Sequence, residues 1–343
     1  MWEIEVGENS SWIVSLATLT CCLGCALTYS IVLGDTFQSL ALTAGFSGIW
    51  ATRYASILTI SFLALYPLSR LQSLAALAPV SMVGVFGIVV TCIFMGSRYF
   101  GSAYRLPNGA LLSTLAPTLL PSFQARTSQT NPMSALILGS MSATAFLSHF
   151  AAPDFLNLLK QGPTTLRDYG RLTLQSFTGV ALINIAILTF GFLTFGGNSA
   201  GMVLNNYSNL DLGASVCRLL MAVSVIGGYP FLLRACNSSL VRLLWKHGEV
   251  TAPTSRRISA TILAGLTGVS LLLKNAGLVV SFNGAVMGSA ITYIFPAILL
   301  LKSKLGGKIE RLTSRLLIVF GVMVAFMGGS VSLMNAFAPN LLL

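Results

Sequence analysis

A run of polar residues interrupts one apolar stretch of this chain between positions 142 and 154. It holds three hydroxyl side chains, followed by His149, Pro153 and Asp154. A His-x4-Asp pair can supply a general base for acyl transfer, so His149 and Asp154 leave open a lipid-modifying membrane enzyme. No companion glycerolipid-binding motif is found. In the alternative interpretation, His149 lines a polar path or forms a hydrogen bond near the membrane interface.

A second stretch, residues 222–230, combines Ser224 with residues that weaken a helix. Gly227, Gly228 and Pro230 follow the serine. Glycine lowers helix stability and proline removes a helical N–H, so an interruption of the helix is expected here. Interrupted membrane helices can bind cations through freed carbonyls and carboxylates through helix N-termini. The alternative is a proline kink whose polar groups are satisfied by neighbouring helices.

Few charged residues fall within the apolar stretches. Asp35 follows Gly34 where the first stretch is expected to end, and it is either a gating acid or an ordinary interfacial carboxylate. Arg218 lies near the end of another stretch and can snorkel to the surface. No Asp or Glu lies in the middle of a stretch, so a carboxylate proton relay is not indicated. Coupling to Na⁺ or H⁺ through hydroxyls, carbonyls or His149 stays open.

The six cysteines do not indicate a metal site. Cys22 and Cys25 have redox or zinc spacing, but they lie in the middle of an apolar helix, where packing is the better interpretation. No cluster of cysteine and histidine supports zinc. We therefore expect no cofactor and no metal other than sodium.

These residues belong to nine apolar stretches, most of them long enough to cross a bilayer. A helix needs about 20 apolar residues to span roughly 30 Å of hydrocarbon. Hydrophobic residues make up 55% and charged residues 8% of the 343 residues, against about 25% charged in soluble proteins. We therefore expect one all-α, multi-pass transmembrane domain over residues 1–343. The expected spans lie near 12–33, 54–68, 74–96, 133–155, 172–195, 212–233, 258–273, 278–301 and 316–334.

The positive charges predict the orientation of these spans. The chain has 20 Lys and Arg against 9 Asp and Glu, and they cluster in short loops, which indicates membrane topology rather than nucleic-acid binding. Of these, 14 fall in one set of alternate loops and 5 in the other. The positive-inside rule places the richer set and the N-terminus in the cytosol. Of the sequons at Asn9, Asn206 and Asn237, only Asn206 then faces outward.

Several motifs together resemble the amino acid/auxin permease family, which includes sodium-coupled neutral amino acid transporters and vacuolar amino acid transporters. Residues 25–35, ending in Gly34-Asp35, are similar to the family's third helix. Residues 67–79 resemble its turn from the fourth to the fifth helix. Residues 145–155, with a histidine before an Ala-Pro pair, resemble its sixth helix. Residues 191–196, followed by 204–207, resemble the end of its seventh helix. Residues 284–289 and 296–297 resemble its tenth helix.

The resemblance implies a five-plus-five inverted-repeat fold, leucine-transporter-like, with an eleventh helix. The nine expected spans would be the third to eleventh helices, so the chain is N-terminally incomplete relative to that fold, without counterparts of the first two. A further departure is residues 233–237, where the family usually has an arginine shortly after a Phe-Pro pair.

The resemblance also implies roles for particular residues. Each of them has an alternative interpretation as a packed or backbone-bonded residue. A sodium ion would be bound by Ser224, and Asp35 and His149 would act in gating or line a polar path. The substrate would be bound by Tyr29, Ser142, Thr144, Phe146 and Ser148.

The function expected from the resemblance is ion-coupled secondary transport of neutral amino acids by alternating access. The partners would be an amino acid and the lipid bilayer, without nucleic acid, and the oligomeric state is left open. The location would be the plasma membrane or a vacuolar or lysosomal membrane. Two alternatives remain: a truncated, non-transporting relative that acts as a sensor or partner subunit, and a lipid-modifying enzyme that uses His149 and Asp154.

Overall fold

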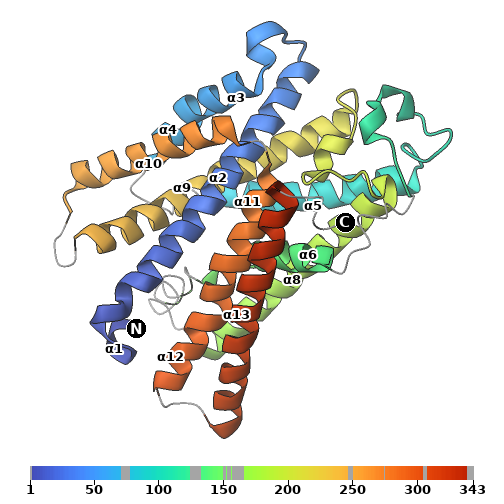
Figure 1. Ribbon diagram of the computed structural model, residues 1–343. Coiled ribbons are helices and arrows are strands. Elements are labelled where there is room, and N and C mark those ends of the chain that lie inside the picture. Colours follow the sequence, from blue (N-terminus) through green and yellow to red (C-terminus); the bar gives the residue numbers. More distant parts are fainter. Residues whose placement is uncertain are drawn as a thin grey trace.

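The computed structural model describes residues 2–70, 78–123, 133–149, 152, 156, 166–245, 250–273, 275–303 and 307–337. These residues form a bundle of helices (Figure 1). Among them no β-strand is present, and the one pairing of extended backbone is an isolated bridge between Ser122 and Gly196. The all-α prediction is confirmed, while the inverted repeat stays a prediction.

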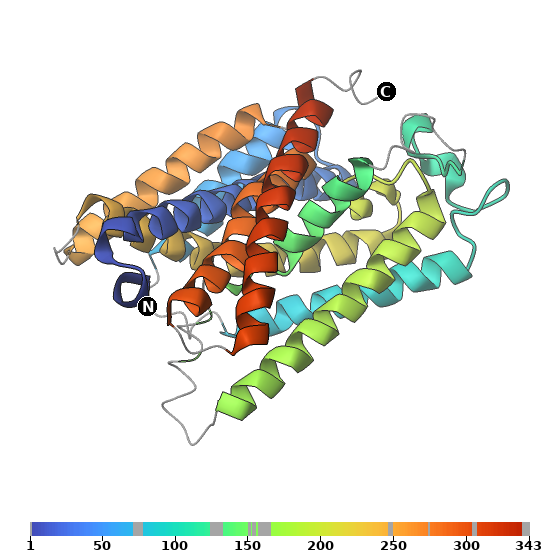
Figure 2. The same cartoon turned by 60° about the horizontal axis from the view of Figure 1, so that its bottom comes forward.

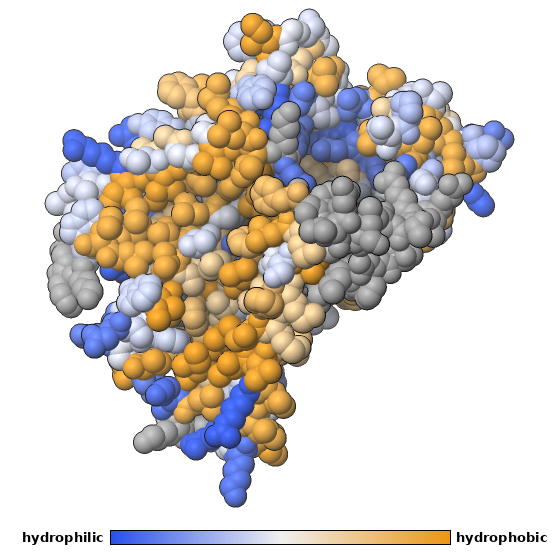
Figure 3. Space-filling view, viewed as in Figure 1, coloured by the Kyte–Doolittle hydropathy of each residue, from blue (hydrophilic) through white to orange (hydrophobic). Residues whose placement is uncertain are grey.

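Six helices in the described ranges are long and apolar enough to cross a membrane. Each overlaps one of the predicted spans. The hydrophobic residues on the face shown in Figure 3 cover the middle of the bundle, with hydrophilic residues toward its ends. The protein is therefore a multi-pass membrane protein. The six are α2 (Ser11–Thr43), α5 (Ala78–Phe100), α8 (Leu166–Phe195), α9 (Leu212–Leu244), a run from α11 to α12, and α13 (Lys308–Phe337).

The run from α11 to α12 is helical throughout but not α-helical throughout. It consists of α11 (Ala276–Asn283), the π-helix η10 (Gly284–Gly288), the π-helix η11 (Ala290–Ile294) and α12 (Phe295–Ser303). π-Helical turns are rare and often lie at functional sites. The regularity of the backbone is therefore disturbed in the eighth predicted span, where the sequence analysis expected an ordinary helix.

The other three predicted spans are helices outside that set of six. Residues 54–68 lie in a run of α3 (Arg53–Ile60), the π-helix η3 (Ser61–Leu65) and α4 (Tyr66–Ser69). Residues 258–273 lie in α10 (Ala252–Leu272), and residues 133–155 begin as α6 (Met133–Ala145). Short elements precede or connect the long helices: α1 (Trp2–Glu5), η1 (Glu8–Ser10), η2 (Gly48–Ala51), η5 (Leu112–Thr114), η6 (Pro117–Leu119) and η9 (Val203–Asn206).

The expected interruption of the sixth span is wrong, because α9 continues unbroken through Pro230. Its glycines serve close packing instead. A Cβ atom on Gly227 would lie 2.5 Å from Cγ1 of Val80 on α5, and one on Gly228 would lie 3.2 Å from the Tyr29 ring on α2. Burial between two helices thus holds the segment helical despite its weak intrinsic propensity.

The expected end of the first helix at Asp35 is also wrong, because α2 continues to Thr43. Gly34 lets α3 approach closely, since a Cβ atom there would clash with the side chain of Ile57. Asp35 therefore lies within a helix and against a neighbouring helix, not at a free end.

Helix α2 lies at the centre of one half of the bundle. It packs against α3, α9, α10 and α11, with a core that includes Leu33, Leu65, Tyr229 and Leu233. A second core joins α5, α8 and the N-terminal part of α9 around Phe94, Phe195 and Tyr207. Figures 1 and 2 show α2, α9 and α10 on one side, α5 and α8 on the other, and the α11–α13 hairpin in front.

Hydrogen bonds connect several of the loops predicted to face outward, together with the helix ends that flank them. Thr43 donates to the Asn209 carbonyl, Arg53 donates to the Leu273 carbonyl, and the Ser122 N–H donates to the Phe195 carbonyl. Side-chain caps begin three helices at this end: Thr52 for α3, Asp211 for α9 and Asn275 for α11. We call it the outer end, and its exposure outside the cytosol stays a prediction.

Candidate functional site

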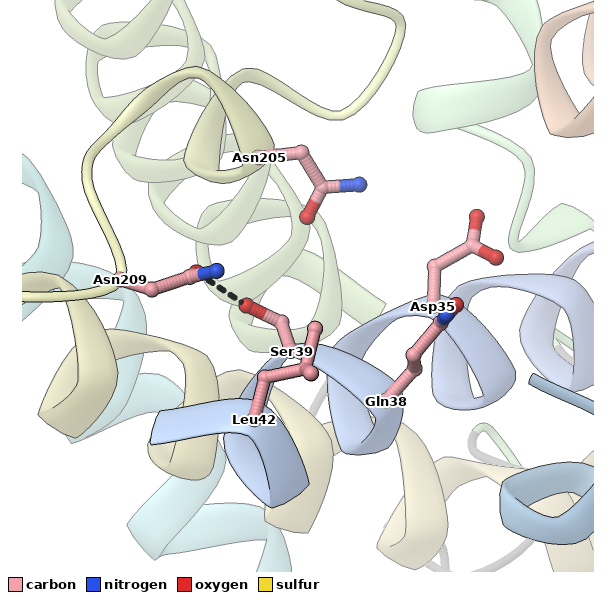
Figure 4. A pocket seen from close by; sticks show the side chains of 6 residues that line it. All are labelled: Asp35, Gln38, Ser39, Leu42, Asn205 and Asn209. Carbon is pink, nitrogen blue, oxygen red and sulfur yellow. Dashed lines mark hydrogen bonds between the residues drawn. The ribbon is translucent and has the colours of Figure 1, made fainter. Parts of the chain in front are cut away.

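A pocket of about 240 Å³ opens at the outer end between α2 and the segment that joins α8 to α9. Figure 4 shows the side chains of Asp35 and Asn205 reaching into the same space from opposite sides. Five of the six residues that line the pocket are polar, and Asp35 alone carries a charge. The lining residues are Asp35, Gln38, Ser39, Leu42, Asn205 and Asn209.

Asp35 is fixed from behind by one arginine. The Arg53 Nε–H donates to Asp35 Oδ1 at 2.8 Å, and Arg53 Nη2 donates to the Leu273 carbonyl at 2.8 Å. The arginine side chain is 10% exposed and the aspartate side chain 28%. Arg53 therefore engages one carboxylate oxygen and ties α2, α3 and the end of α10 together, while the aspartate stays accessible from the pocket.

The opposite wall, residues 203–211, is held in place by buried hydrogen bonds. Arg218 is 1% exposed, and its Nη2 donates to the carbonyls of Leu204 and Tyr207 at 2.9 and 2.6 Å. Asn206 accepts from the Ala200 N–H and donates to the Asn198 carbonyl. The sequence analysis allowed Arg218 to snorkel to the surface. It does not do so, because its guanidinium donates to backbone carbonyls of this wall.

A second set of contacts fixes the end of the same wall. Asp211, whose side chain is fully buried, accepts two hydrogen bonds from the Arg98 guanidinium at 2.7 and 2.8 Å. The Tyr104 hydroxyl donates to the Asp211 carboxylate at 3.1 Å and accepts from the Ser208 N–H at 3.1 Å. Burial raises the pKa of the Tyr104 hydroxyl above its ordinary value, so the phenol keeps its proton and acts as a donor here.

Two asparagines of this wall face the pocket. Asn209 Oδ1 accepts a hydrogen bond of 2.7 Å from the Ser39 hydroxyl, drawn as a dashed line in Figure 4. Asn205 Oδ1 is buried and has no hydrogen-bond partner. A buried, unpaired polar atom costs free energy, and such atoms in native proteins call for an explanation. Because this oxygen is buried, it is also shielded from the pocket, which Asn205 lines with its other atoms.

The predicted residues Tyr29 and Ser224 lie on two sides of the same part of α9: Tyr29 packs on it from α2, and Ser224 belongs to α9 itself. Tyr29 lies against Gly228, and its ring centroid is 6.5 Å from that of Tyr229. Ser224 faces α5, since a Cβ atom on Gly84 would lie 2.6 Å from its Oγ. The neighbouring hydroxyls of Ser30 and Tyr229 share a hydrogen bond of 2.8 Å. Their predicted roles in binding substrate and sodium stay predictions.

The predicted residues of the fourth span lie where its helix stops. Helix α6 ends at Ala145, and Leu147 and Ser148 have no regular secondary structure. The Thr144 hydroxyl lies 3.2 Å from the Ser140 carbonyl and 3.1 Å from the Val280 carbonyl, both of which accept from it. The helix therefore ends inside the predicted span 133–155, as an interruption requires. Ser142 lies on its last turn.

Phe146 and His149 point to a different neighbour. The Phe146 ring stacks on Phe177 of α8 with centroids 6.1 Å apart, and the His149 ring lies 6.3 Å from the same phenylalanine. Ser148 and His149 are exposed. Asp154, the partner required by the lipid-enzyme interpretation, lies outside the described residues. The structure thus brings Thr144 to α11 and Phe146 with His149 to α8, and it joins neither group to Tyr29.

Asn283 is a polar contact that the sequence analysis missed. It is 5% exposed, and its Nδ2 donates to the Cys21 carbonyl of α2 at 3.0 Å. The first π-helix begins at the next residue, Gly284, which lies so close to Thr144 and Ser140 that a Cβ atom there would clash. The sequence signal was an asparagine directly before a Gly-x-x-x-Gly run inside an apolar span.

The pocket itself was largely missed as well. The sequence analysis selected Asp35, but not Arg53, Gln38, Asn205 or Asn209. The available signal was the polar composition of residues 205–211, which hold three amides and one carboxylate between two spans. That composition is ordinary for a loop, so only the packing of the loop against α2 distinguishes it.

One predicted consequence of topology concerns the glycosylation sequons. Asn206 is fully buried with both ends of its amide bonded, and Asn237 is buried and donates to Ser255 and Ser259. Asn9 is exposed. The sequon at Asn206 is therefore used for structure in the folded protein.

The chain resembles known transporters over most of its length. A protein of Danio rerio that carries the name of a sodium-coupled neutral amino acid transporter is 24% identical over 311 residues, 88% of this chain and 65% of that protein. Vacuolar amino acid transporter 2 of Saccharomyces cerevisiae is 24% identical over 97% of this chain and 70% of its own length. Sodium-coupled neutral amino acid transporter 7 of Homo sapiens is 22% identical over 96% of this chain and 71% of its own length.

The chain thus spans about two thirds of the length of these relatives. The model of one family, described as transmembrane amino acid transporter protein, matches residues 4–334. Together with the six apolar helices, this match confirms the resemblance stated from the motifs. The chain belongs to the transmembrane amino acid transporter family.

Proposed function

We propose that this chain carries amino acids across a membrane as an ion-coupled secondary transporter. The observation that carries the proposal, beside family membership, is the end of α6 at Ala145 within an apolar span. Hydroxyl groups of Ser142 and Thr144 lie on the turn before that end, next to a π-helical neighbour. Backbone that leaves the helix in this way supplies unpaired polar groups inside a membrane protein.

The mechanism would be alternating access. Helices α2, α9 and α10 pack into one tight unit, and α6 with the π-helical run packs beside it. A rocking motion of the second group against the first would expose a site to one side of the membrane and then to the other. The substrate would be held by polar groups at the end of α6 and by Tyr29 of α2, which do not contact one another in this structure, and no covalent chemistry would be needed.

Neutral amino acids are the proposed substrates, because two of the relatives named above carry the name of sodium-coupled neutral amino acid transporters. The coupling ion would be Na⁺, bound with the help of the Ser224 hydroxyl, or H⁺. The membrane would be the plasma membrane or that of a vacuole or lysosome. A relative named as vacuolar supports the second location.

Flux in proteoliposomes tests the proposal. Purified full-length chain is reconstituted, radiolabelled alanine is supplied outside, and a Na⁺ gradient or a pH gradient is imposed in separate arms. Uptake above protein-free vesicles that depends on one gradient supports the proposal and identifies the ion. Absence of uptake in every arm, with protein shown to be folded and inserted, refutes it and favours a non-transporting sensor or partner subunit.

A further inference from the structure

The connection between α2 and α3 exposes three large apolar side chains at the outer end of the bundle, at the top of Figure 1. Phe46, Ile49 and Trp50 are each at least 59% exposed, and residues 44–52 include no charged residue. We call these three residues the apolar tip. Single exposed apolar residues are ordinary on a protein surface, but a cluster of them marks a surface that contacts an apolar partner.

Hydrogen bonds fix the loop that carries the apolar tip. The N–H groups of Gly45 and Phe46 donate to carbonyls of the last turn of α2 at 3.1 and 3.0 Å, and Gly45 has a φ of 82°, which glycine adopts readily after a helix end. Thr52 donates to the Ile49 carbonyl through its N–H and its hydroxyl, at 3.1 and 2.7 Å. The loop therefore holds the three side chains outward by its own structure.

The apolar tip continues along the exposed face of α3, η3 and α4. Tyr54, Leu58 and Phe62 follow one another at intervals of four residues, so they share one side of the helix, and each is at least 52% exposed. The Tyr66 ring stacks on Phe62 with centroids 6.4 Å apart, and the Arg70 guanidinium lies 5.5 Å from the centre of the Tyr66 ring. This exposed face therefore carries no charge from the apolar tip to Arg70, as a face toward lipid requires.

The length of this run places the apolar tip at the boundary of the membrane. From Arg53 to Ser69 the run rises about 25 Å, which is less than the roughly 30 Å of hydrocarbon in a bilayer. With Arg70 at one boundary, where water solvates its charge, the start of α3 lies just within the other. Arg53 is buried there and bonded to Asp35 at 2.8 Å. The loop before Arg53 therefore lies at the level of the lipid headgroups.

The composition of the loop favours lipid over a protein partner. Tryptophan is enriched where a membrane meets water, because its ring is apolar and its N–H can still find a hydrogen-bond partner. A protein interface surrounds its apolar centre with a polar rim, which the uncharged residues 44–52 do not supply. Water is present among the headgroups, so the polar backbone of the loop is satisfied there, as it would not be in the hydrocarbon.

We propose that the apolar tip inserts into the boundary between headgroups and acyl chains, in the leaflet at the outer end, and anchors the loop between α2 and α3 in the lipid. The partner is the bilayer itself. Asp35 and Arg53 lie on the two helices that this loop joins, so the anchor holds their ion pair at a fixed depth. The inference is independent of the transport function, because it concerns only the outer surface of the bundle.

The fluorescence of Trp50 in phosphatidylcholine vesicles tests the insertion. The full-length chain is reconstituted with Trp2→Phe, Trp12→Phe and Trp245→Phe, so that Trp50 is the only tryptophan. Three quenchers are compared: lipid brominated near the headgroup, lipid brominated near the end of the acyl chain, and acrylamide on both sides of the membrane. We expect the shallow bromine to quench most, and acrylamide to quench less than it quenches free tryptophan.

Three results overturn the proposal. Acrylamide quenching as strong as that of free tryptophan, with none from either lipid, places the apolar tip in water. Weak quenching by all three reagents means that protein covers the tip, as a second copy of the chain would. Stronger quenching by the deep bromine than by the shallow one places the tip in the hydrocarbon.

One substitution tests whether the apolar side chains hold the loop in the lipid. Ile49→Asp adds a charge that water solvates better than the membrane boundary does. Quenching of Trp50 by the shallow bromine therefore falls, acrylamide quenching rises, and the emission moves to longer wavelength. Ile4→Asp is the matched control, because Ile4 is exposed on α1, outside the loop, and it leaves all three signals unchanged. Unchanged signals in Ile49→Asp overturn the anchor.

Discussion

Asn283 of α11 reaches α2 at the one place where Gly24 leaves room for it. A Cβ atom on Gly24 would lie 2.6 Å from Cγ of Asn283, and the amide that occupies this space donates to the Cys21 carbonyl at 3.0 Å. The contact joins the central helix α2 to the helix that becomes π-helical at the next residue. It therefore links α2, the centre of one half of the bundle, to the run that contains the π-helical segments η10 and η11.

The first prediction concerns this contact. Gly24→Ala forces the asparagine away, and overpacking of this kind costs about 1–3 kcal/mol. The melting midpoint in detergent therefore falls. The double variant Gly24→Ala/Asn283→Ala recovers part of the loss, because the clashing amide is gone. Gly265→Ala is the matched control, since a Cβ atom there meets nothing within 4 Å. Equal midpoints for Gly24→Ala and Gly265→Ala would contradict the packing described here.

The second prediction concerns the wall of the outer pocket. Asp211→Asn removes the charge that Arg98 and Tyr104 share. Since Arg98 is partly exposed, we expect a loss of about 1–3 kcal/mol rather than the larger cost of a fully buried pair. Tyr104→Phe removes two hydrogen bonds without a cavity and leaves the buried Ser208 N–H unpaired, which costs about 1–3 kcal/mol. Glu5→Gln, the same carboxylate-to-amide change at an exposed residue, leaves the midpoint unchanged.

The third prediction separates two asparagines that each begin a glycosylation sequon. Asn206→Ala loses hydrogen bonds to Asn198 and Ala200 inside the protein, and unfolding becomes easier by about 1–3 kcal/mol because buried partners are left unpaired. Asn9→Ala removes only an exposed side chain and has no such effect. Thermal unfolding of both purified variants checks this. A normal midpoint for Asn206→Ala would mean that its amide does not hold the wall.

The fourth prediction concerns the end of α6. Thr144→Val replaces the hydroxyl that lies between the Ser140 and Val280 carbonyls by a methyl group of similar size. We expect a loss of about 1 kcal/mol in stability and slower alanine flux in proteoliposomes, because α6 and α11 lose their polar contact. Thr144→Ser keeps the hydroxyl and retains most of the flux. A Thr144→Val protein with wild-type flux would exclude a role for this contact in transport.

The sequence predicted the elements well because their signals are local. Apolar length located α2, α5, α8, α9, α13 and the run from α11 to α12, and the motif around His149 located the end of α6. Charge counting separated the loops into two sets, one of which is joined by hydrogen bonds at the outer end. These features depend on composition within one segment, which a single sequence contains in full.

The sequence by itself determined a membrane-embedded helical chain, its approximate spans and its family. Tertiary structure alone decided that α9 stays helical through Pro230, that Asp35 pairs with Arg53, and that Asn205 faces Asp35 across a pocket. The physical reason is that each of these outcomes depends on a partner from another helix or loop. The packing free energy between distant segments outweighs local helix propensity, and the sequence of one segment alone does not reveal that packing.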